Sequence, residues 1–303
     1  MKSVGLLKEQ LKPVIYGLGK FYRISPKNLS EGVEVCRVLH NRSIPTTLGK
    51  FSKAGDDPVE IVREYQLASD AFKSISAETR FYLSLKPPAL NFNLELAAAV
   101  VDTALENGHG VHFDSHDHRL TDPTIRLLEQ VMDRNPSANG STGSWSFSLT
   151  LPSRWKRSMA DADWAAKRGV RARVVKGEFK AESSFDEVEP KKAFLALVER
   201  LGRTVPEIAV ATHDYALARE AIARAKACGS SVVLELLFGV PMGKMVVLSK
   251  ETGVPVRVYV PYGDNLLLYG IRHFLTNPHK LLRFDFPELI TGHKAKLERI
   301  NSL

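Results

Sequence analysis

Charged and hydroxyl-bearing residues follow a series of short apolar segments along this sequence, or stand near their ends. These residues are Lys86, Asp114, Arg173, Lys176, Thr212, His213, Asp214, Glu235, Tyr259 and Tyr262. Cations beside carboxylates and hydroxyls can bind an anionic group or stabilise charge that develops during a reaction. An ion pair at a strand end would explain any one of them alone. Together they predict a site, provided that the apolar segments are strands ending at one edge.

From about residue 40 onward, strand-like segments alternate with segments whose apolar residues recur at helical spacing. The predicted strands cover residues 44–48, 80–85, 110–113, 145–151, 170–175, 207–211, 231–236 and 256–260. The predicted helices include residues 58–73, 94–105, 124–132, 191–201, 214–227 and 241–252. Eight repeated strand and helix units predict an α/β fold with a single (β/α)8 barrel of the TIM type. We expect residues 1–40 to form an N-terminal helical segment and residues 41–303 to form the barrel domain.

The fourth predicted strand indicates what lines the barrel. Phe147, Leu149 and Leu151 alternate with Ser148 and Thr150, so one face is apolar and the other is small and polar. If the apolar face meets the helices, the small side chains line the interior and leave room for a ligand. Barrel enzymes place their chemistry at the carboxyl ends of the strands, where the charged residues above are predicted to lie.

The composition restricts the class of protein. The chain has 303 residues, of which 44% are hydrophobic and 25% charged, and its net charge is +8. No apolar run approaches the roughly 18 residues that a membrane-spanning helix needs. Lys8 and Glu9 stand where a signal peptide needs apolar residues, so we expect a cytoplasmic protein. The positive charge is compatible with peripheral contact with an anionic membrane, and no nucleic-acid-binding motif accompanies it.

Five motifs in order resemble those of the proline dehydrogenase family, flavin-dependent (β/α)8 barrels that oxidise proline to pyrroline-5-carboxylate. The run Arg173-Val174-Val175-Lys176-Gly177 resembles the family's Arg-Leu-Val-Lys-Gly motif of strand five. The other matching runs are Ser84-Leu85-Lys86 with Phe113-Asp114, Ala211-Thr212-His213-Asp214, Leu236-Leu237-Phe238-Gly239, and Arg257 to Gly263 followed by Tyr269 and Arg272. The resemblance extends from about residue 44 to residue 284 and implies an FAD cofactor.

The resemblance also implies roles for individual residues. It places Arg173, Val175, Lys176, Gly177, Thr212, His213 and Glu235 around the flavin, and Lys86, Asp114, Tyr259, Tyr269 and Arg272 around the substrate. A cation such as Arg173 would stabilise the negative charge that the flavin gains when its N5 receives a hydride. Arg272 offers a planar fork for a substrate carboxylate, and Asp114 would hold Lys86 charged and in position.

Several positions depart from the family's pattern. His273 replaces a second arginine, Thr276 replaces a glutamate and Phe179 replaces a tyrosine. Glu178 stands in place of a small residue, Glu235 in place of a glutamine, and residues 149–152 contain no counterpart of the strand-four glutamine. The family's cofactor-contacting stretch after strand five is replaced by residues 189–193. Phe179, Leu237 and His273 are therefore predicted to alter the substrate pocket. We expect the substrate to be proline or a related cyclic or secondary amino acid.

Two other interpretations remain open from the sequence. A metal-dependent barrel hydrolase would use the cluster around the third strand, which comprises His109, His112, Asp114, His116, Asp117 and His118. The cations Lys86, Arg173 and Lys176 would repel a metal there. Alternatively, the departures from the family indicate a barrel that binds flavin or another ligand without turnover. An active enzyme would also need an electron acceptor, such as a membrane quinone.

Overall fold

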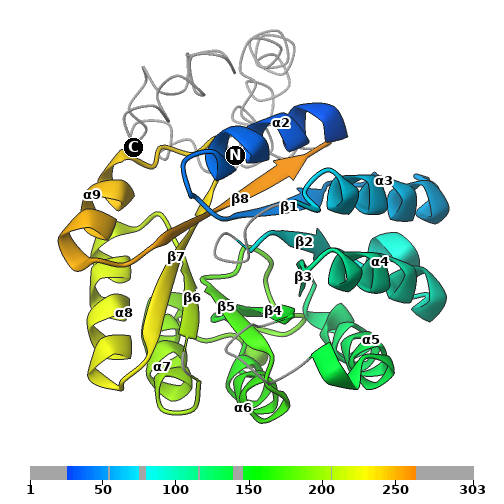
Figure 1. The fold of residues 1–303 in the computed structure, drawn as a ribbon. Coiled ribbons are helices and arrows are strands. Elements are labelled where there is room, and N and C mark those ends of the chain that lie inside the picture. The colour runs from blue at the N-terminus through cyan, green and yellow to red at the C-terminus, as the bar shows by residue number, and fades with distance from the viewer. Residues whose placement is uncertain are drawn as a thin grey trace, which may run out of the picture.

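Eight parallel strands close into a barrel with helices around it (Figure 1). The computed structural model describes residues 26–53, 55–74, 80–114, 117–138, 146–205 and 207–263. Each strand pairs with its neighbour in the chain, and β1 closes the barrel by pairing with β8. The strands are β1 (Thr46–Lys50), β2 (Tyr82–Leu85), β3 (Gly110–Phe113), β4 (Phe147–Pro152), β5 (Arg171–Val175), β6 (Glu207–Ala211), β7 (Ser231–Leu237) and β8 (Val256–Tyr262). The predicted (β/α)8 fold is confirmed.

Helices follow the strands in strict alternation. They are α3 (Pro58–Asp70), α4 (Leu94–Glu106), α5 (Thr121–Arg134), α6 (Ser158–Arg168), α7 (Pro190–Gly202), α8 (Tyr215–Ala227) and α9 (Gly243–Thr252). Short polar residues fix several starts: the side chains of Asp57, Asn93 and Asp214 each accept a bond from a backbone N–H in the first turn. Gly169 ends α6 at a φ of +68°, a conformation that glycine adopts without strain. Each described helix is too short or too polar to cross a membrane.

Within the described residues, one helix comes before the first strand and packs on the barrel between its first and last strands. This helix, α2 (Leu29–His40), lies alongside β1 and β8 in Figure 1. At Gly32 a Cβ atom would come within 3.0 Å of Leu48 and 3.4 Å of Tyr262, so the glycine permits this close approach. The helix places Val35, Cys36 and Leu39 in the hydrophobic core. The prediction of an N-terminal helix outside the barrel is confirmed for these residues, and residues 1–25 lie outside the described part.

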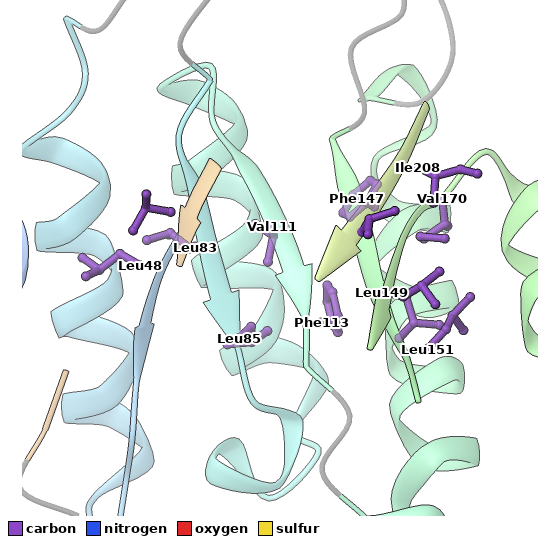
Figure 2. Close-up of a cluster of buried hydrophobic side chains, with 14 of the residues drawn as sticks. Leu48, Leu83, Leu85, Val111, Phe113, Phe147, Leu149, Leu151, Val170 and Ile208 are labelled. Carbon is purple, nitrogen blue, oxygen red and sulfur yellow. The ribbon is translucent and has the colours of Figure 1, made fainter. Parts of the chain in front are cut away.

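The main hydrophobic core lies between the barrel wall and the helices. Alternate residues of the strands supply it, among them Leu83 and Leu85 of β2, Val111 and Phe113 of β3, and Phe147, Leu149 and Leu151 of β4 (Figure 2). The residues between them face the barrel interior. Because the apolar face of β4 packs outward as predicted, the small polar residues of this strand line the interior.

Candidate active site

Side chains from four strands meet at the carboxyl end of the barrel. Lys86 directly follows β2, Asp114 directly follows β3, Arg173 lies on β5 and Tyr259 on β8. The Lys86 ammonium is 3.6 Å from a carboxylate oxygen of Asp114 and donates to the Tyr259 hydroxyl at 3.1 Å. Arg173 donates to the other Asp114 oxygen at 2.7 Å. All four side chains are buried. The sequence predicted each of them as a site residue, and the structure places them in contact.

Aromatic rings enclose the two cations of this cluster. The Lys86 ammonium lies 4.3 Å from the centre of the Phe51 ring, and the Arg173 guanidinium lies 5.1 Å from the centre of the Tyr259 ring. Such contacts favour a positive charge because the face of an aromatic ring is electron-rich. Phe51, which directly follows β1, was not predicted as a site residue. No sequence motif marks it, and the parallel pairing of β1 with β2, in which Gly49 lies opposite Ser84, brings it beside Lys86.

Two carboxylates and a hydroxyl hold the Arg173 guanidinium in place. It donates to Asp114, to the Thr150 hydroxyl at 2.8 Å and to Glu235 at 3.2 Å. Its Nε is buried and has no hydrogen-bond partner among the described residues. Burial lowers the pKa of Arg173, but Asp114 and Glu235 outweigh that effect and raise it. Arg173 is therefore a fixed and permanently charged group.

The hydroxyl of Thr150 determines which ring nitrogen of His112 carries the proton. The Thr150 hydroxyl donates its only hydrogen to Asp114 at 2.9 Å, so it can only accept from Arg173 and from His112 Nε2, which is 2.8 Å away. His112 Nε2 therefore carries the proton, and Nδ1 accepts from the Ser148 hydroxyl at 2.8 Å. Burial, aided by the charge of Arg173, holds the pKa of His112 well below its usual value. The ring is a neutral structural link between β3 and β4.

A second charged layer lies deeper in the barrel. Glu235 accepts from Arg173 with one oxygen and from Arg171 with the other, at 3.3 Å. Arg171 also donates to Glu207 at 3.0 Å. Burial alone would raise the pKa of Glu235, but the charges of Arg173 and Arg171 outweigh that effect and lower the pKa to about 2. Glu235 was predicted beside the cofactor, and its described contacts are with these two arginines.

Arg257 completes this deeper layer without a carboxylate partner in contact. It donates to the backbone carbonyls of Thr46 and Arg80, both at 2.8 Å, and lies over the Tyr82 ring at 4.6 Å. Burial and the nearby Arg171 lower its pKa to about 10, so it stays charged at neutral pH. His112 contacts the small side chains of β4 by bonding Ser148 and Thr150, and Arg171 and Arg257 are buried in the barrel as well.

Thr212 and His213, which directly follow β6 and were predicted to contact the cofactor, make structural hydrogen bonds. His213 Nδ1 donates to the Pro241 carbonyl at 3.2 Å, and Nε2 accepts from the backbone N–H of Leu237 at 2.9 Å. Burial lowers the pKa of His213, in agreement with this neutral form. The buried Thr212 hydroxyl accepts from the backbone N–H of Asp214. Together these bonds fix the end of β6 against the end of β7.

The loop after β5 carries the remaining predicted residues of the described chain. Lys176 lies 3.8 Å from the carboxylate of Asp214, which also pairs with Lys191 at 2.8 Å. Gly177 has a φ of +84°, and a Cβ there would come within 2.9 Å of Pro152, so this turn requires glycine. The Phe179 side chain is 44% exposed, while its carbonyl accepts from the Trp155 indole. Val175 and Leu237 are half-buried at the strand ends.

Several sequence-predicted residues cannot be placed beside this cluster. Tyr269, Arg272, His273 and Thr276 lie outside the described residues. Their roles remain predictions from the sequence.

The histidine cluster around β3 does not converge as a metal site. His109 contacts the Ser69 carbonyl at 3.0 Å, and both nitrogens of His112 contact hydroxyls. In the ranges that the structure describes, no group of three or more histidine, cysteine, aspartate or glutamate residues could hold a metal ion. His116 lies outside those ranges. The geometry therefore does not favour the metal-dependent hydrolase.

Comparison with known proteins agrees with the sequence motifs. No known family model matches the chain. Proline dehydrogenase 1 of Bacillus subtilis strain 168 is 21% identical over 274 residues, which cover 86% of this chain and 87% of that protein. The same relationship is found with proline dehydrogenase 1 of Bacillus subtilis subsp. natto, also at 21% identity.

Solved structures of larger proteins contain a similar barrel. Proline utilization A from Bdellovibrio bacteriovorus, inactivated by N-propargylglycine, matches 90% of this chain with a TM-score of 0.69 and 15% identity. A mutant of proline utilization A from Bradyrhizobium japonicum matches 89% with a TM-score of 0.67 and 16% identity. This chain spans about a third of each, 34% and 32% respectively. Together the comparisons support a divergent member of the proline dehydrogenase family, as the motifs predicted.

Proposed function

We propose that this protein oxidises proline, or a related cyclic or secondary amino acid, to the corresponding imine with FAD as its cofactor. The observation that carries the proposal is the contact of Lys86, Asp114, Arg173 and Tyr259 at one rim of the barrel. The sequence similarity to proline dehydrogenase 1 extends over 86% of the chain and supports the same reaction class.

The residues at the rim fit an electron-accepting ring. FAD, when bound, supplies the site that accepts the hydride and thereby gains negative charge. Arg173 meets that requirement because it is buried, permanently charged and fixed by two carboxylates, and its Nε has no hydrogen-bond partner in the part of the chain that the structure describes. Such preorganised charge stabilises a developing anion more strongly than mobile charge in water does. Lys176 and Thr212, at the neighbouring strand ends, are the residues that we assign to the rest of the cofactor.

The chain's own residues would bind and orient the amino acid. Lys86 provides a positive charge for its carboxylate, and Asp114 holds that ammonium in place at 3.6 Å. Tyr259 provides an apolar wall whose hydroxyl is already bonded to Lys86. We assign Arg272 and Tyr269 to the other side of the substrate on the strength of their motif. A neutral His273 in place of a second arginine would weaken carboxylate binding and relax the choice of amino acid.

The proposal is tested by the cofactor content and the substrate range of the purified protein. We expect bound FAD, and we expect its oxidised absorbance to fall when proline, another cyclic amino acid or an N-methylated amino acid is added without oxygen. N-propargylglycine, which inactivated the similar Bdellovibrio protein, should also inactivate this one. A protein that takes up no flavin on reconstitution would overturn the proposal. Bound flavin that no such amino acid reduces would instead indicate a ligand-binding barrel without turnover.

The matched variants are Arg173→Met and Arg200→Met. Arg200 lies on the outside of the barrel, where it pairs with Asp163. We expect Arg173→Met to lose most of the flavin and Arg200→Met to retain it. Equal retention would contradict a role for Arg173 at the cofactor. We further expect a cytoplasmic enzyme that passes its electrons to a separate acceptor, such as a quinone at the membrane face.

A further inference from the structure

Glu235 connects the candidate site to the deeper charged layer of the barrel. Its two carboxylate oxygens accept from different arginines, Arg173 at 3.2 Å and Arg171 at 3.3 Å. The side chain is almost completely buried, with 2% of its surface exposed. A carboxylate with so little solvent acts on its neighbours more strongly than an exposed carboxylate does. The sequence resemblance places an uncharged glutamine at this position.

The charges inside the barrel are nearly balanced, and Glu235 stands at the centre of that balance. Among the described residues, the interior cations Lys86, Arg171, Arg173 and Arg257 face the carboxylates Asp114, Glu207 and Glu235. Glu207, at the amino end of β6, is partly exposed, and Arg171 is its one ion-pair partner among the residues that the structure describes. Removing the charge of Glu235 would leave two buried arginines with one carboxylate fewer between them.

We propose that Glu235 is a positioning residue that sets the electron affinity of the cofactor site through Arg173. This inference rests on the proposed function, since it concerns the flavin that Arg173 would face. Glu235 acts in two ways. It fixes the Arg173 guanidinium through Nη1, whereas Asp114 binds Nη2, and it cancels part of the positive field that the guanidinium applies to the ring. A fixed carboxylate at 3.2 Å therefore makes the site less electron-attracting than a neutral glutamine would.

The predicted effect has a definite direction. Glu235→Gln increases the positive charge around Arg173, which stabilises any anion formed on the flavin. Arg171→Gln has the opposite effect, because it leaves Glu235 to act on Arg173 alone. A merely structural role would change stability and would not produce opposite changes in electron affinity. Glutamine has nearly the same shape as glutamate, so Glu235→Gln preserves packing inside the barrel.

Sulfite is the probe, because its addition to an oxidised flavin gives an anionic adduct whose formation bleaches the flavin. We expect Glu235→Gln to lower the dissociation constant of sulfite about tenfold and Arg171→Gln to raise it. Glu207→Gln is the control, since it removes a carboxylate that contacts Arg171 and not Arg173, and we expect a change of about twofold at most. The redox potential of the bound flavin should rise in Glu235→Gln and fall in Arg171→Gln.

The outcomes separate this inference from the proposed function. A wild-type protein that binds no flavin would overturn both. Flavin-loaded proteins in which Glu235→Gln binds sulfite no more tightly than the wild type would overturn this inference and leave the proposed function intact. If Glu235→Gln does not fold, a sulfite affinity in Arg171→Gln that is unchanged or tighter would overturn it in the same way. Equal changes in the dissociation constant of sulfite in Glu235→Gln and Glu207→Gln would also contradict an effect of Glu235 that acts through Arg173.

Discussion

Asp114 pairs with both cations at the rim, so replacing it by asparagine should destabilise the fold. The change leaves Lys86 and Arg173 buried and removes the carboxylate that contacts both. Breaking a buried ion pair by removing one partner costs about 3–5 kcal/mol. The asparagine oxygen can still accept from Arg173, so we expect the lower end of that range, about 3 kcal/mol. That is a large share of the 5–15 kcal/mol by which domains are typically stable.

The measurement is urea unfolding at neutral pH, followed by the fluorescence of the three tryptophans. Asp163→Asn is the control, because Asp163 forms a similar ion pair with Arg200 on the exposed surface. Exposed pairs contribute little, so the control should unfold near the wild-type midpoint. The slope of the transition should be the same in all three proteins. An Asp114→Asn protein as stable as the control would refute the description of the rim as a buried, mutually dependent charge cluster.

Three further predictions concern other parts of the site and fold. Burial, with the charges of Arg257 and His109, lowers the pKa of His40 to about 4 from 6.5, so the folded protein keeps this ring neutral while the unfolded chain protonates it. Stability should therefore fall as the pH drops from about 6.5 toward 4, and His40→Gln should flatten that dependence in unfolding measurements at several pH values. Thr150→Val removes a hydroxyl that bonds three neighbours, so it should lower the free energy of unfolding by about 2 kcal/mol and lose most of the bound flavin. Thr150→Ser should retain both the stability and the flavin. Equal stability and flavin content in the two variants would contradict the hydrogen-bond network around Thr150. Arg272→Ala should raise the substrate KM more than Phe179→Tyr does, and equal effects in steady-state kinetics would argue against a carboxylate clamp.

The fold was predictable because each strand shows its pattern locally. In β4 the alternation of Phe147, Leu149 and Leu151 with Ser148 and Thr150 marks one outward and one inward face, and the structure confirms it. Helix α6 had no predicted counterpart, since alanines and charged residues dominate it and few large apolar residues mark its buried face. Strand β8 also runs two residues beyond its predicted end, because Pro261 and Tyr262 continue to pair with β1.

The rim of the site was predictable, and the layer beneath it was not. Lys86 and Asp114 directly follow strands, and Arg173 and Tyr259 lie on strands two and three residues before the strand end. The carboxyl-terminal parts of parallel strands meet in a closed barrel. Arg171 lies two residues before Arg173 and so faces the same side, which is a signal that the sequence contained. Its pairing with Glu235 depends on the register of β5, β6 and β7, which no single segment encodes.

We propose that Arg173 and its partners at the rim hold a flavin that accepts electrons from a cyclic amino acid. The decisive test is the anaerobic absorbance spectrum of the flavin-loaded protein, recorded with increasing L-proline. We predict that the oxidised absorbance of the wild type falls and that its rate of loss saturates with proline. Arg173→Met, reconstituted to the same flavin content, should respond at least tenfold more slowly. A wild-type spectrum unchanged by proline and related amino acids, or an Arg173→Met variant that responds equally fast, would contradict it.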